Sequence, residues 1–276
     1  MKRVLGYLVA ILIVYVGLLV LLRIFESHLI FFPDVPGRLS GDWQPHGLPV
    51  EDVWLHAADG IKLHAWWIAA AGAEFTFVAF HGNAANIANR ADMYQVLRSV
   101  PANVLAVEYR GYGKSEGKPD EAGLYLDAQA AYEYLLKERG IAPRRIVAIG
   151  HSLGTAVATD LASKREVGGL VLEAPFASGA AVARRVYPFL PGLGAVLKTK
   201  FETGKKLAQI RAPVLVMHCK DDPVIPFAVG EEVFRMAREP KTFVQIEGFC
   251  HEEAALMAPE VYLAKLREFL AAIPTQ

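Results

Sequence analysis

Short, continuous runs of apolar residues alternate with amphipathic stretches over most of the chain after residue 50. Strands that are apolar on both faces and alternate with helices indicate a parallel sheet covered by helices on both sides. The pattern therefore predicts an α/β domain over residues 50–276. The expected parallel strands are Phe75–Phe80, Val104–Tyr109, Arg145–Gly150, Gly169–Glu173, Pro213–His218 and Thr242–Glu247.

Two further strands are expected before the parallel set. Val53–His56 and Ile61–Trp66 alternate in polarity around the sequence Ala-Ala-Asp-Gly, which is typical of a hairpin turn. They bring the predicted sheet to eight strands, most of them parallel. The intervening stretch Glu121–Arg139 predicts a helix, because it begins with an acidic residue, ends with basic ones and stops at Gly140.

One long irregular interval, Phe176–Ala212, interrupts this alternation. It lies between the fourth and fifth expected parallel strands, where such folds often insert a cap, and its length predicts a small one. A second irregular segment, from Asp34 to Pro49, is rich in proline and glycine and predicts a linker or an extended crossing segment.

The N-terminal residues Val4–Leu22 are uncharged and mostly aliphatic. As a helix they would span about 28 Å, close to the hydrocarbon thickness of a bilayer. A cleaved signal peptide would have a shorter apolar region and a small-residue cleavage site, which the residues after Leu22 do not provide. A buried core helix would carry a polar stripe. We therefore expect residues 1–25 to form a membrane anchor.

The residues that flank the expected anchor bear on its topology. Lys2 and Arg3 before it, against Arg23 after it, favour an N-terminus on the inside and a catalytic domain on the non-cytoplasmic side. Residues 26–49 are then a juxtamembrane linker. Its first part, Glu26–Pro33 (ESHLIFFP), is apolar and aromatic, which predicts a segment in the membrane interface.

Charge and composition exclude several classes of function. Lys+Arg and Asp+Glu number 29 each in 276 residues, so the chain lacks the basic excess of a nucleic-acid-binding protein. The two cysteines, Cys219 and Cys250, fit no zinc or redox spacing. His251-Glu252-Glu253 lacks the second histidine of a zinc-peptidase motif. We expect no metal and no organic cofactor.

The sequence Gly150-His151-Ser152-Leu153-Gly154 follows an apolar strand and precedes a helix-prone stretch. A serine hydroxyl becomes available for catalysis when a sharp strand-to-helix turn lifts it clear of the sheet. Glycines on either side permit that turn, because a Cβ there would crowd the neighbouring backbone. The helix N-terminus adds a positive end where negative charge develops. Ser152 is therefore the candidate nucleophile.

A serine nucleophile of this kind needs a base and an acid, which follow it along the chain in the order acid, then histidine. Of the eight histidines, only His251 lies beyond the last expected strand, so it is the candidate base. The acid is expected at the carboxyl end of the penultimate strand, where Asp221 and Asp222 are adjacent. Glu173, at the end of the preceding strand, is a third candidate.

These blocks together resemble the α/β-hydrolase superfamily, in its membrane-anchored branch of serine-aminopeptidase-like and acyl-protein-thioesterase-like hydrolases. The resemblance extends over essentially the whole chain. The blocks that carry it are His81–Ile87, Tyr109–Gly117, Gly150–Gly154, the Asp222–Pro226 turn and the stretch ESHLIFFP. The chain differs from the family at Cys219, where glycine is usual. It also differs at Phe249-Cys250, where Gly-Gly or a similar pair is common.

The resemblance implies roles for particular residues. The family's acid precedes a proline by four residues, which selects Asp222 over Asp221. The family's oxyanion hole maps onto the backbone amides of Leu153 and Asn83. His81 is expected to be structural and to bond nearby backbone, and Tyr109–Gly117 to pack under the active site.

The fold also predicts where the two cysteines lie. Cys219 ends the strand that precedes the acid, and Cys250 directly precedes the base, so both should lie at one sheet edge beside the site. As free cysteines they would be small apolar residues filling space. Alternatively, they form a disulfide that ties the acid loop to the base loop, which requires an oxidising compartment and Cα atoms within about 7 Å.

The function expected from these residues is hydrolysis of an ester, thioester or amide bond through an acyl-enzyme on Ser152. A carboxylesterase, lipase or thioesterase acting on a small-molecule or lipid-like acyl substrate is favoured. A serine peptidase of the aminopeptidase type is the alternative among enzymes. A membrane-tethered binding protein that retains the fold without catalysis is the alternative outside them.

Overall fold

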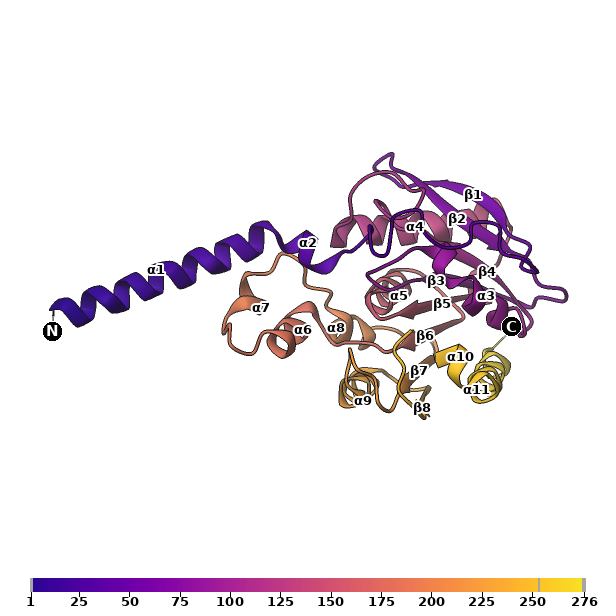
Figure 1. Ribbon diagram of the computed structural model, residues 1–276. Helices are drawn as coiled ribbons and strands as arrows, with labels where there is room; N and C mark the ends of the chain where they lie inside the picture. The colour runs from indigo at the N-terminus through magenta and orange to yellow at the C-terminus, as the bar shows by residue number, and fades with distance from the viewer. Residues whose placement is uncertain (1, 253, 275–276) are drawn as a thin grey trace.

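Eight strands form one sheet in the computed structural model, which describes residues 2–252 and 254–274 (Figure 1). The strand order is β1-β2-β4-β3-β5-β6-β7-β8. The pairings β1–β2 and β2–β4 are antiparallel and the others are parallel, which confirms the predicted sheet. The strands are β1 (Glu51–His56), β2 (Lys62–Ile68), β3 (Phe75–Phe80), β4 (Ala102–Val107), β5 (Ile146–His151), β6 (Gly169–Glu173), β7 (Val214–Cys219) and β8 (Lys241–Ile246).

Helices cover both faces of the sheet and enclose two apolar cores. One face packs against α4, α5 and α9, and the other against α3, α10 and α11. The interior strands β3, β5, β6 and β7 are buried along their whole length, as strands between two helical layers must be. The helices are α3 (Ala91–Leu97), α4 (Glu121–Lys137), α5 (Leu153–Lys164), α9 (Phe227–Met236), α10 (Ala254–Met257) and α11 (Pro259–Ala271), with short 3-10 turns at Ile87–Arg90 and Pro143–Arg145.

The last strand differs from its expected environment. β8 lies at the edge of the sheet, and Thr242 and Gln245 on it are exposed, whereas a strand covered on both faces was expected. Thr242 and Gln245 point to opposite faces of this strand, so helices leave both faces partly open at the edge of the sheet. The stop of α4 agrees with expectation, because Gly140 adopts a positive φ of 65° just beyond its end.

The cap is small, as predicted. It comprises residues 176–212 and holds α6 (Gly179–Val186), α7 (Leu193–Val196) and α8 (Thr203–Leu207) between β6 and β7. Figure 1 shows α6 and α7 beside the junction between the N-terminal helix and the domain.

The N-terminal helix α1 (Lys2–Ile24) projects away from the domain (Figure 1). It is long and apolar enough to cross a membrane, and its residues within the described chain are not buried. Its 23 residues span about 34 Å at 1.5 Å per residue. The short helix α2 (Glu26–Ile30) follows it directly.

The segment that follows α1 is held by the domain more tightly than expected for an interfacial segment. The carboxylate of Glu26 accepts hydrogen bonds from the backbone N–H groups of Lys198 (2.7 Å) and Thr199 (2.6 Å) in the cap. Phe31 is buried in the main core, and Phe32 forms a bridge with Ala84. The prediction of a segment lying along the membrane surface was therefore wrong for these residues, because the core offered an apolar site for Phe31.

Helix α5 approaches the sheet closely at two glycines. A Cβ on Gly154 would overlap the backbone carbonyl of Phe80 in β3, and a Cβ on Gly150 would overlap the carbonyl of Gly154. Backbone atoms cannot move aside as the end of a flexible side chain can. Both positions therefore require glycine, and they set the distance between α5 and the strands beneath it.

We predict that Gly154→Ala destabilises the protein by about 1–3 kcal/mol or more, as overpacking of a close contact does. Gly37→Ala is the matched control, because a Cβ there would meet only the Ser40 side chain at an ordinary 3.7 Å. Thermal unfolding of the detergent-solubilised variants measures both changes. Equal midpoints for the two variants would contradict the close approach of α5.

Candidate active site

Ser152 lies at the turn between β5 and α5 in a conformation that L-residues rarely adopt. Its φ and ψ are 49° and −114°. The turn is held on both sides, because the Ser152 amide donates to the carbonyl of Glu173 at 2.9 Å and the Ser152 carbonyl accepts from the Thr155 hydroxyl at 2.6 Å. A backbone of this kind costs about 1–3 kcal/mol and persists where the surrounding structure enforces it. The hydroxyl is thereby presented at the carboxyl edge of the sheet.

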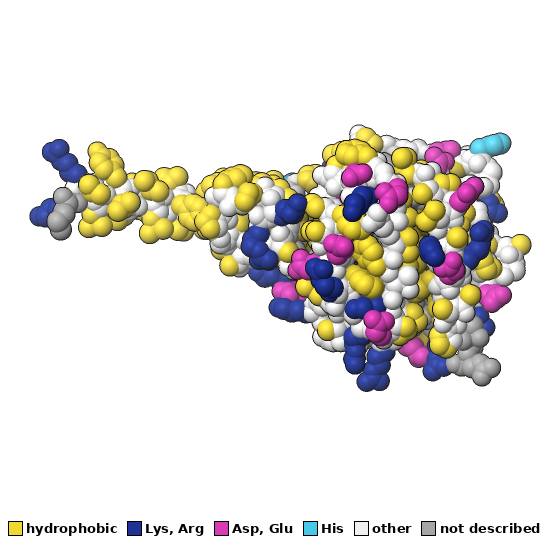
Figure 2. Space-filling view, turned by 90° about the horizontal axis from the view of Figure 1, so that it is seen from below, with side chains coloured by type: hydrophobic (Ala, Val, Ile, Leu, Met, Phe, Trp, Pro, Cys, Tyr) yellow, Lys and Arg dark blue, Asp and Glu magenta, His cyan; other side chains and the backbone are white. Residues whose placement is uncertain are grey.

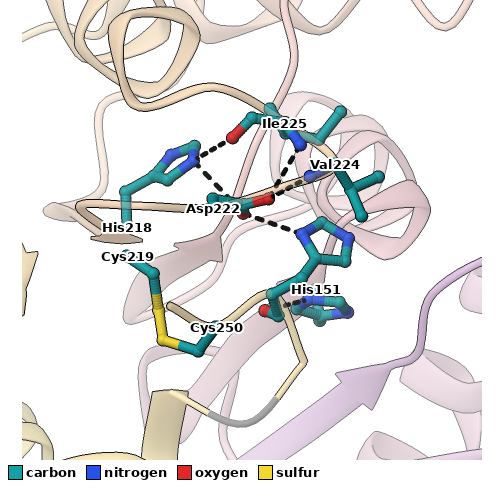
Figure 3. Close-up of a disulfide and its surroundings, with 8 residues drawn as sticks. His151, His218, Cys219, Asp222, Val224, Ile225 and Cys250 are labelled. Carbon is teal, nitrogen blue, oxygen red and sulfur yellow. Dashed lines mark hydrogen bonds and ion pairs between the residues drawn. A yellow bond between two sulfur atoms is a disulfide. The ribbon is translucent and has the colours of Figure 1, made fainter. Parts of the chain in front are cut away.

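His251 and Asp222 are joined by a hydrogen bond at the same edge (Figure 3). Nδ1 of His251 donates to Oδ2 of Asp222 at 2.8 Å. The other oxygen of Asp222 accepts the backbone N–H groups of Val224 and Ile225, each at 2.8 Å. Because the carboxylate holds the proton on Nδ1, Nε2 of His251 is left as an acceptor. This is the tautomer that a general base requires.

A second histidine supports Asp222 from behind. Nε2 of His218, in β7, donates to the carbonyl of Ile225 at 2.7 Å and lies 3.4 Å from Oδ2 of Asp222 (Figure 3). Burial by itself raises the pKa of Asp222, but the hydrogen bonds from His218 and His251 outweigh it and hold that pKa well below its usual range. Asp222 is therefore ionised at neutral pH. The sequence analysis missed His218, for which the one available signal was its position four residues before the acid.

The loop after β8 that carries His251, which we call the base loop after the role expected of His251, is tied to the Ser152 turn. Nε2 of His151, the residue before Ser152, donates to the carbonyl of His251 at 2.9 Å. The two imidazole rings meet edge to face with centroids 4.8 Å apart. Burial lowers the pKa of His151 to about 3, so this ring is neutral. His151 thus ties the base loop to the residue next to Ser152 in the chain.

An ion pair gives the base loop a further tie. Glu252 contacts Arg90 at 2.9 Å, and Arg90 in turn donates to the backbone carbonyls of Ala84 and Asn86. Although burial raises the pKa of Glu252, the Arg90 guanidinium and the nearby histidines outweigh it and lower that pKa. The pair therefore joins the loop after β8 to the loop after β3.

Cys219 and Cys250 form a disulfide at this edge (Figure 3). Their Cα atoms are 5.7 Å apart, within the range that a disulfide bridges. The cysteines lie where the fold predicted, and of the two interpretations the one with free, space-filling thiols was wrong. The disulfide ties the strand that precedes Asp222 to the residue before His251.

Asn83 and Leu153 bring two backbone amides to the nucleophile turn. Within residues 2–252 and 254–274 neither amide donates a hydrogen bond to the protein. The Asn83 loop is fixed on its other side, because the Tyr112 hydroxyl and the Phe32 amide donate to the Asn83 carbonyl at 2.7 and 2.9 Å. The Asn83 side chain donates to the Ile30 carbonyl at 2.9 Å. Tyr112 belongs to the loop that was expected to pack under the site.

The structure separates the other acid candidates from the base. Asp221 is exposed, and the buried carboxyl of Glu173 accepts a hydrogen bond from the Tyr262 hydroxyl of α11. His81 bonds the carbonyl of Gly82 and lies 3.1 Å from Glu108, as a structural histidine does. In the described part of the chain, no group of three His, Cys, Asp or Glu side chains is arranged to hold a metal ion.

A pocket of about 280 Å³ opens beside Ser152. Ser152, Leu153 and Asn83 are among the residues that line it. The rest of its wall is almost entirely apolar and comes from α1, α2, the cap and the turn after β7. These lining residues are Leu22, Glu26, Leu29, Ile30, Phe176, Gly179, Val182, Ala183, Val186, Tyr187, Leu193, Leu197, Thr199, Phe201, Val224 and Ile225.

Comparison with known proteins identifies the family. Residues 77–203 match the alpha/beta hydrolase family. An alpha/beta hydrolase domain-containing protein of Arabidopsis thaliana, WAV2, is 34% identical over 276 residues, which cover 91% of this chain and 89% of WAV2. The chain belongs to the α/β-hydrolase family.

Other relatives and solved structures agree with this assignment. Human alpha/beta hydrolase domain-containing protein 17B is 32% identical over 204 residues, which cover 72% of this hydrolase and 67% of the relative. The esterase Pf2001 of Pyrococcus furiosus superposes with a TM-score of 0.71 at 22% identity, over 88% of this chain and 97% of the esterase. An α/β hydrolase of Vibrio vulnificus superposes with a TM-score of 0.67 at 22% identity, over 80% and 81% of the two chains. The superpositions show a shared fold.

We predict that reduction of the Cys219–Cys250 disulfide lowers the stability of this hydrolase by about 4 kcal/mol, from the entropy of opening a loop of this length. The cysteines are 31 residues apart. Unfolding of the full chain in detergent, with and without reductant, measures the change. The Cys219→Ser/Cys250→Ser double variant is the control, and it should not respond to reductant. An unchanged wild-type midpoint would contradict the prediction.

We predict that the buried carboxyl group of Glu173 makes the stability of the protein depend on pH. Burial raises its pKa from 4.5 to about 7 in the folded protein. Between these values the unfolded chain has released the proton while the folded protein retains it, so stability falls as pH rises from about 4.5 to 7. Glu173→Gln should stabilise the protein above pH 7 by up to about 3 kcal/mol, and hardly at pH 4.5. Unfolding at both pH values tests this, and a gain that is equal at both would contradict it.

Proposed function

We propose that this hydrolase is a serine enzyme that cleaves ester or thioester bonds through Ser152, His251 and Asp222. The observation that carries the proposal is the hydrogen bond between His251 and Asp222 beside the Ser152 turn. A carboxylate that fixes one ring nitrogen of a histidine, next to a serine on a strained strand-to-helix turn, is the arrangement that activates a hydroxyl for attack. Within residues 2–252 and 254–274, Asp222 is the acidic side chain that hydrogen-bonds the His251 ring.

The reaction proceeds by two acyl transfers. Ser152 Oγ attacks the substrate carbonyl carbon while its proton passes to Nε2 of His251. The tetrahedral intermediate collapses, the bond to the leaving group breaks, and His251 returns the proton to that group. Water then attacks the acyl-enzyme and gives a proton to His251, and the second collapse releases the carboxylic acid and restores the Ser152 hydroxyl. Asp222 stays ionised and stabilises the imidazolium in both halves.

The negative charge of each intermediate develops on the former carbonyl oxygen. The amides of Leu153 and Asn83, which have no partner in the described chain, are suited to receive it. Preorganised N–H donors of this kind stabilise the intermediate by about 3 kcal/mol each. Because Tyr112 and Phe32 hold the Asn83 loop, the donors require little rearrangement during the reaction.

The lining of the pocket favours an acyl substrate over the charged amino terminus of a peptide. An aminopeptidase must bind a charged substrate amine, for which a free carboxylate is the natural partner. Glu26 is the acidic residue among the pocket-lining residues that the structure describes, and its two oxygens are already bonded to the amides of Lys198 and Thr199. The remaining surface is suited to an apolar acyl chain.

We further propose that α1 is retained as a single-pass anchor and that the catalytic domain lies on the non-cytoplasmic side. Leu22 of α1 lines the pocket, so loss of the helix would remove part of the pocket wall. The Cys219–Cys250 disulfide supports an oxidising compartment. Division of the chain into an anchor (1–25), a juxtamembrane linker (26–49) and a catalytic domain (50–276) remains part of this proposal.

The triad is tested by the rates of three variants on p-nitrophenyl acyl esters of increasing chain length. Ser152→Ala should abolish turnover without changing the unfolding midpoint. Asp222→Asn should lower kcat by about three to four orders of magnitude, because the imidazole loses its tautomer. Asp221→Asn is the matched control and should leave kcat unchanged. Substantial turnover by Ser152→Ala, or a larger loss at Asp221 than at Asp222, would overturn the assignment.

A further inference from the structure

The cap reaches along the anchor helix and not merely to its end. The hydroxyl of Tyr15 donates to the carbonyl of Pro191, and the Arg23 guanidinium donates to the carbonyl of Val196. Tyr15 and Arg23 are eight residues apart on α1, or about 12 Å along its axis. The cap tip, which we define as residues 186–192, therefore lies beside the second half of the apolar span (Figure 1).

This contact constrains where a membrane surface can lie. If the whole cap tip were in water, α1 would enter the bilayer only on the N-terminal side of Tyr15. Only residues 4–15, about 18 Å of helix, would then remain to cross about 30 Å of hydrocarbon. The exposed apolar side chains of Val16, Val20 and Leu21 would also be left in water. A bilayer placed to cover them also covers the cap tip.

The surface of the cap tip fits such a position. Phe189 is 72% exposed and Val186 54% exposed, although both are large and apolar. Arg184 and Arg185, exposed at the end of α6, lie next to them in the chain. Aromatic and aliphatic residues beside arginines are typical of elements at the boundary between headgroups and acyl chains. Figure 2 shows Lys and Arg side chains gathered where the anchor joins the domain.

The anchor also lowers the cost of placing this irregular backbone in a membrane. Backbone carbonyls without partners are costly in lipid. Tyr15 and Arg23 of α1 supply donors to two carbonyls of the cap, those of Pro191 and Val196. The helix therefore supplies donors to one carbonyl of the cap tip and to one carbonyl of α7 next to it.

The pocket ends at the same place. Its outer wall is formed by Leu22 and Leu29 on the anchor side and by Val186, Tyr187 and Leu193 on the cap side. Ser152 is also among the residues that line it. An apolar channel thus runs from the nucleophile to the junction of anchor and cap tip.

We propose that the cap tip is inserted in the membrane beside α1, at the boundary of headgroups and acyl chains, and that the pocket takes the acyl chain of a membrane lipid directly from that leaflet. The inference rests on the proposed function, since it assigns that site a membrane-resident acyl substrate and an entry route. The chain moves from hydrocarbon into an apolar pocket without crossing water, so its apolar surface is never exposed.

Insertion is tested without catalysis. A fluorescent thiol label is placed on Phe189→Cys in the full chain, reconstituted in phosphatidylcholine vesicles, while the native cysteines stay in their disulfide. Ala71→Cys is the control, because Ala71 is exposed at the turn before β3, at the opposite edge of the sheet. Nitroxides near the headgroup end of lipid acyl chains should quench the label at 189 severalfold more than the label at 71. Equal quenching of the two, with iodide in water quenching both, would overturn the proposal.

Substrate entry is tested with Phe189→Asp, which changes the cap tip at a residue that does not line the pocket. This variant should hydrolyse a long-chain acyl ester embedded in vesicles at least about tenfold more slowly than the wild type, since a charge opposes insertion. Its rate on water-soluble p-nitrophenyl acetate should be unchanged. Val261→Asp, at an exposed valine of α11 far from the anchor, should match the wild type on both substrates.

The rates on the two substrates distinguish failure of the entry route from failure of the proposed function. If the wild type hydrolyses both substrates and Phe189→Asp does so equally well, entry from the membrane is wrong and the serine hydrolase stands. If the wild type hydrolyses neither, the proposed function fails and the entry route fails with it.

Discussion

The strained backbone of Ser152 is the constraint on which the candidate site depends. Ser152 has a positive φ at the turn where α5 approaches β3 and β5, and that approach is possible only with glycine at positions 150 and 154. The turn determines where the hydroxyl points and where the Leu153 amide begins the helix. The remaining residues of the site are then brought to this fixed point by loops.

Those loops are restrained by contacts of different kinds. The base loop is held by a disulfide, by the Arg90–Glu252 ion pair and by the hydrogen bond from His151 to the carbonyl of His251. Asp222 is held by two backbone amides and by His218. Since a base must be placed to within about half an ångström, several independent restraints are more effective than one. The disulfide adds a covalent restraint that persists only under oxidising conditions.

The segment after α1 links the proposed anchor to the candidate site. Ile30 and Phe32 bond the Asn83 loop, while Glu26 bonds the cap amides. The same few residues therefore position one proposed oxyanion donor, the cap and the end of α1. The proposed anchor and the pocket wall are parts of one structure in this hydrolase.

The sequence predicts those features that depend on local pattern. Apolar runs locate the strands, the Gly150–Gly154 sequence locates the nucleophile turn, and the position of His251 after the last strand places it at the correct edge. Features that depend on contacts between distant residues escape such reasoning. The support of Asp222 by His218, the Arg90–Glu252 pair and the burial of Phe31 are of this kind. Pairing of the cysteines was left undecided, because parallel neighbouring strands bring them near one another but do not fix the separation of their Cα atoms.

The central claim is that Ser152 is an activated nucleophile, and covalent labelling tests it most directly. The full chain in detergent micelles is treated with a fluorophosphonate probe, and the labelled peptide is identified by mass spectrometry. We predict a single adduct on Ser152, formed at a rate that falls by orders of magnitude in His251→Ala. Absence of labelling, or labelling at Ser152 that is equally fast without His251, would contradict the account and favour a binding protein that keeps the fold without the chemistry.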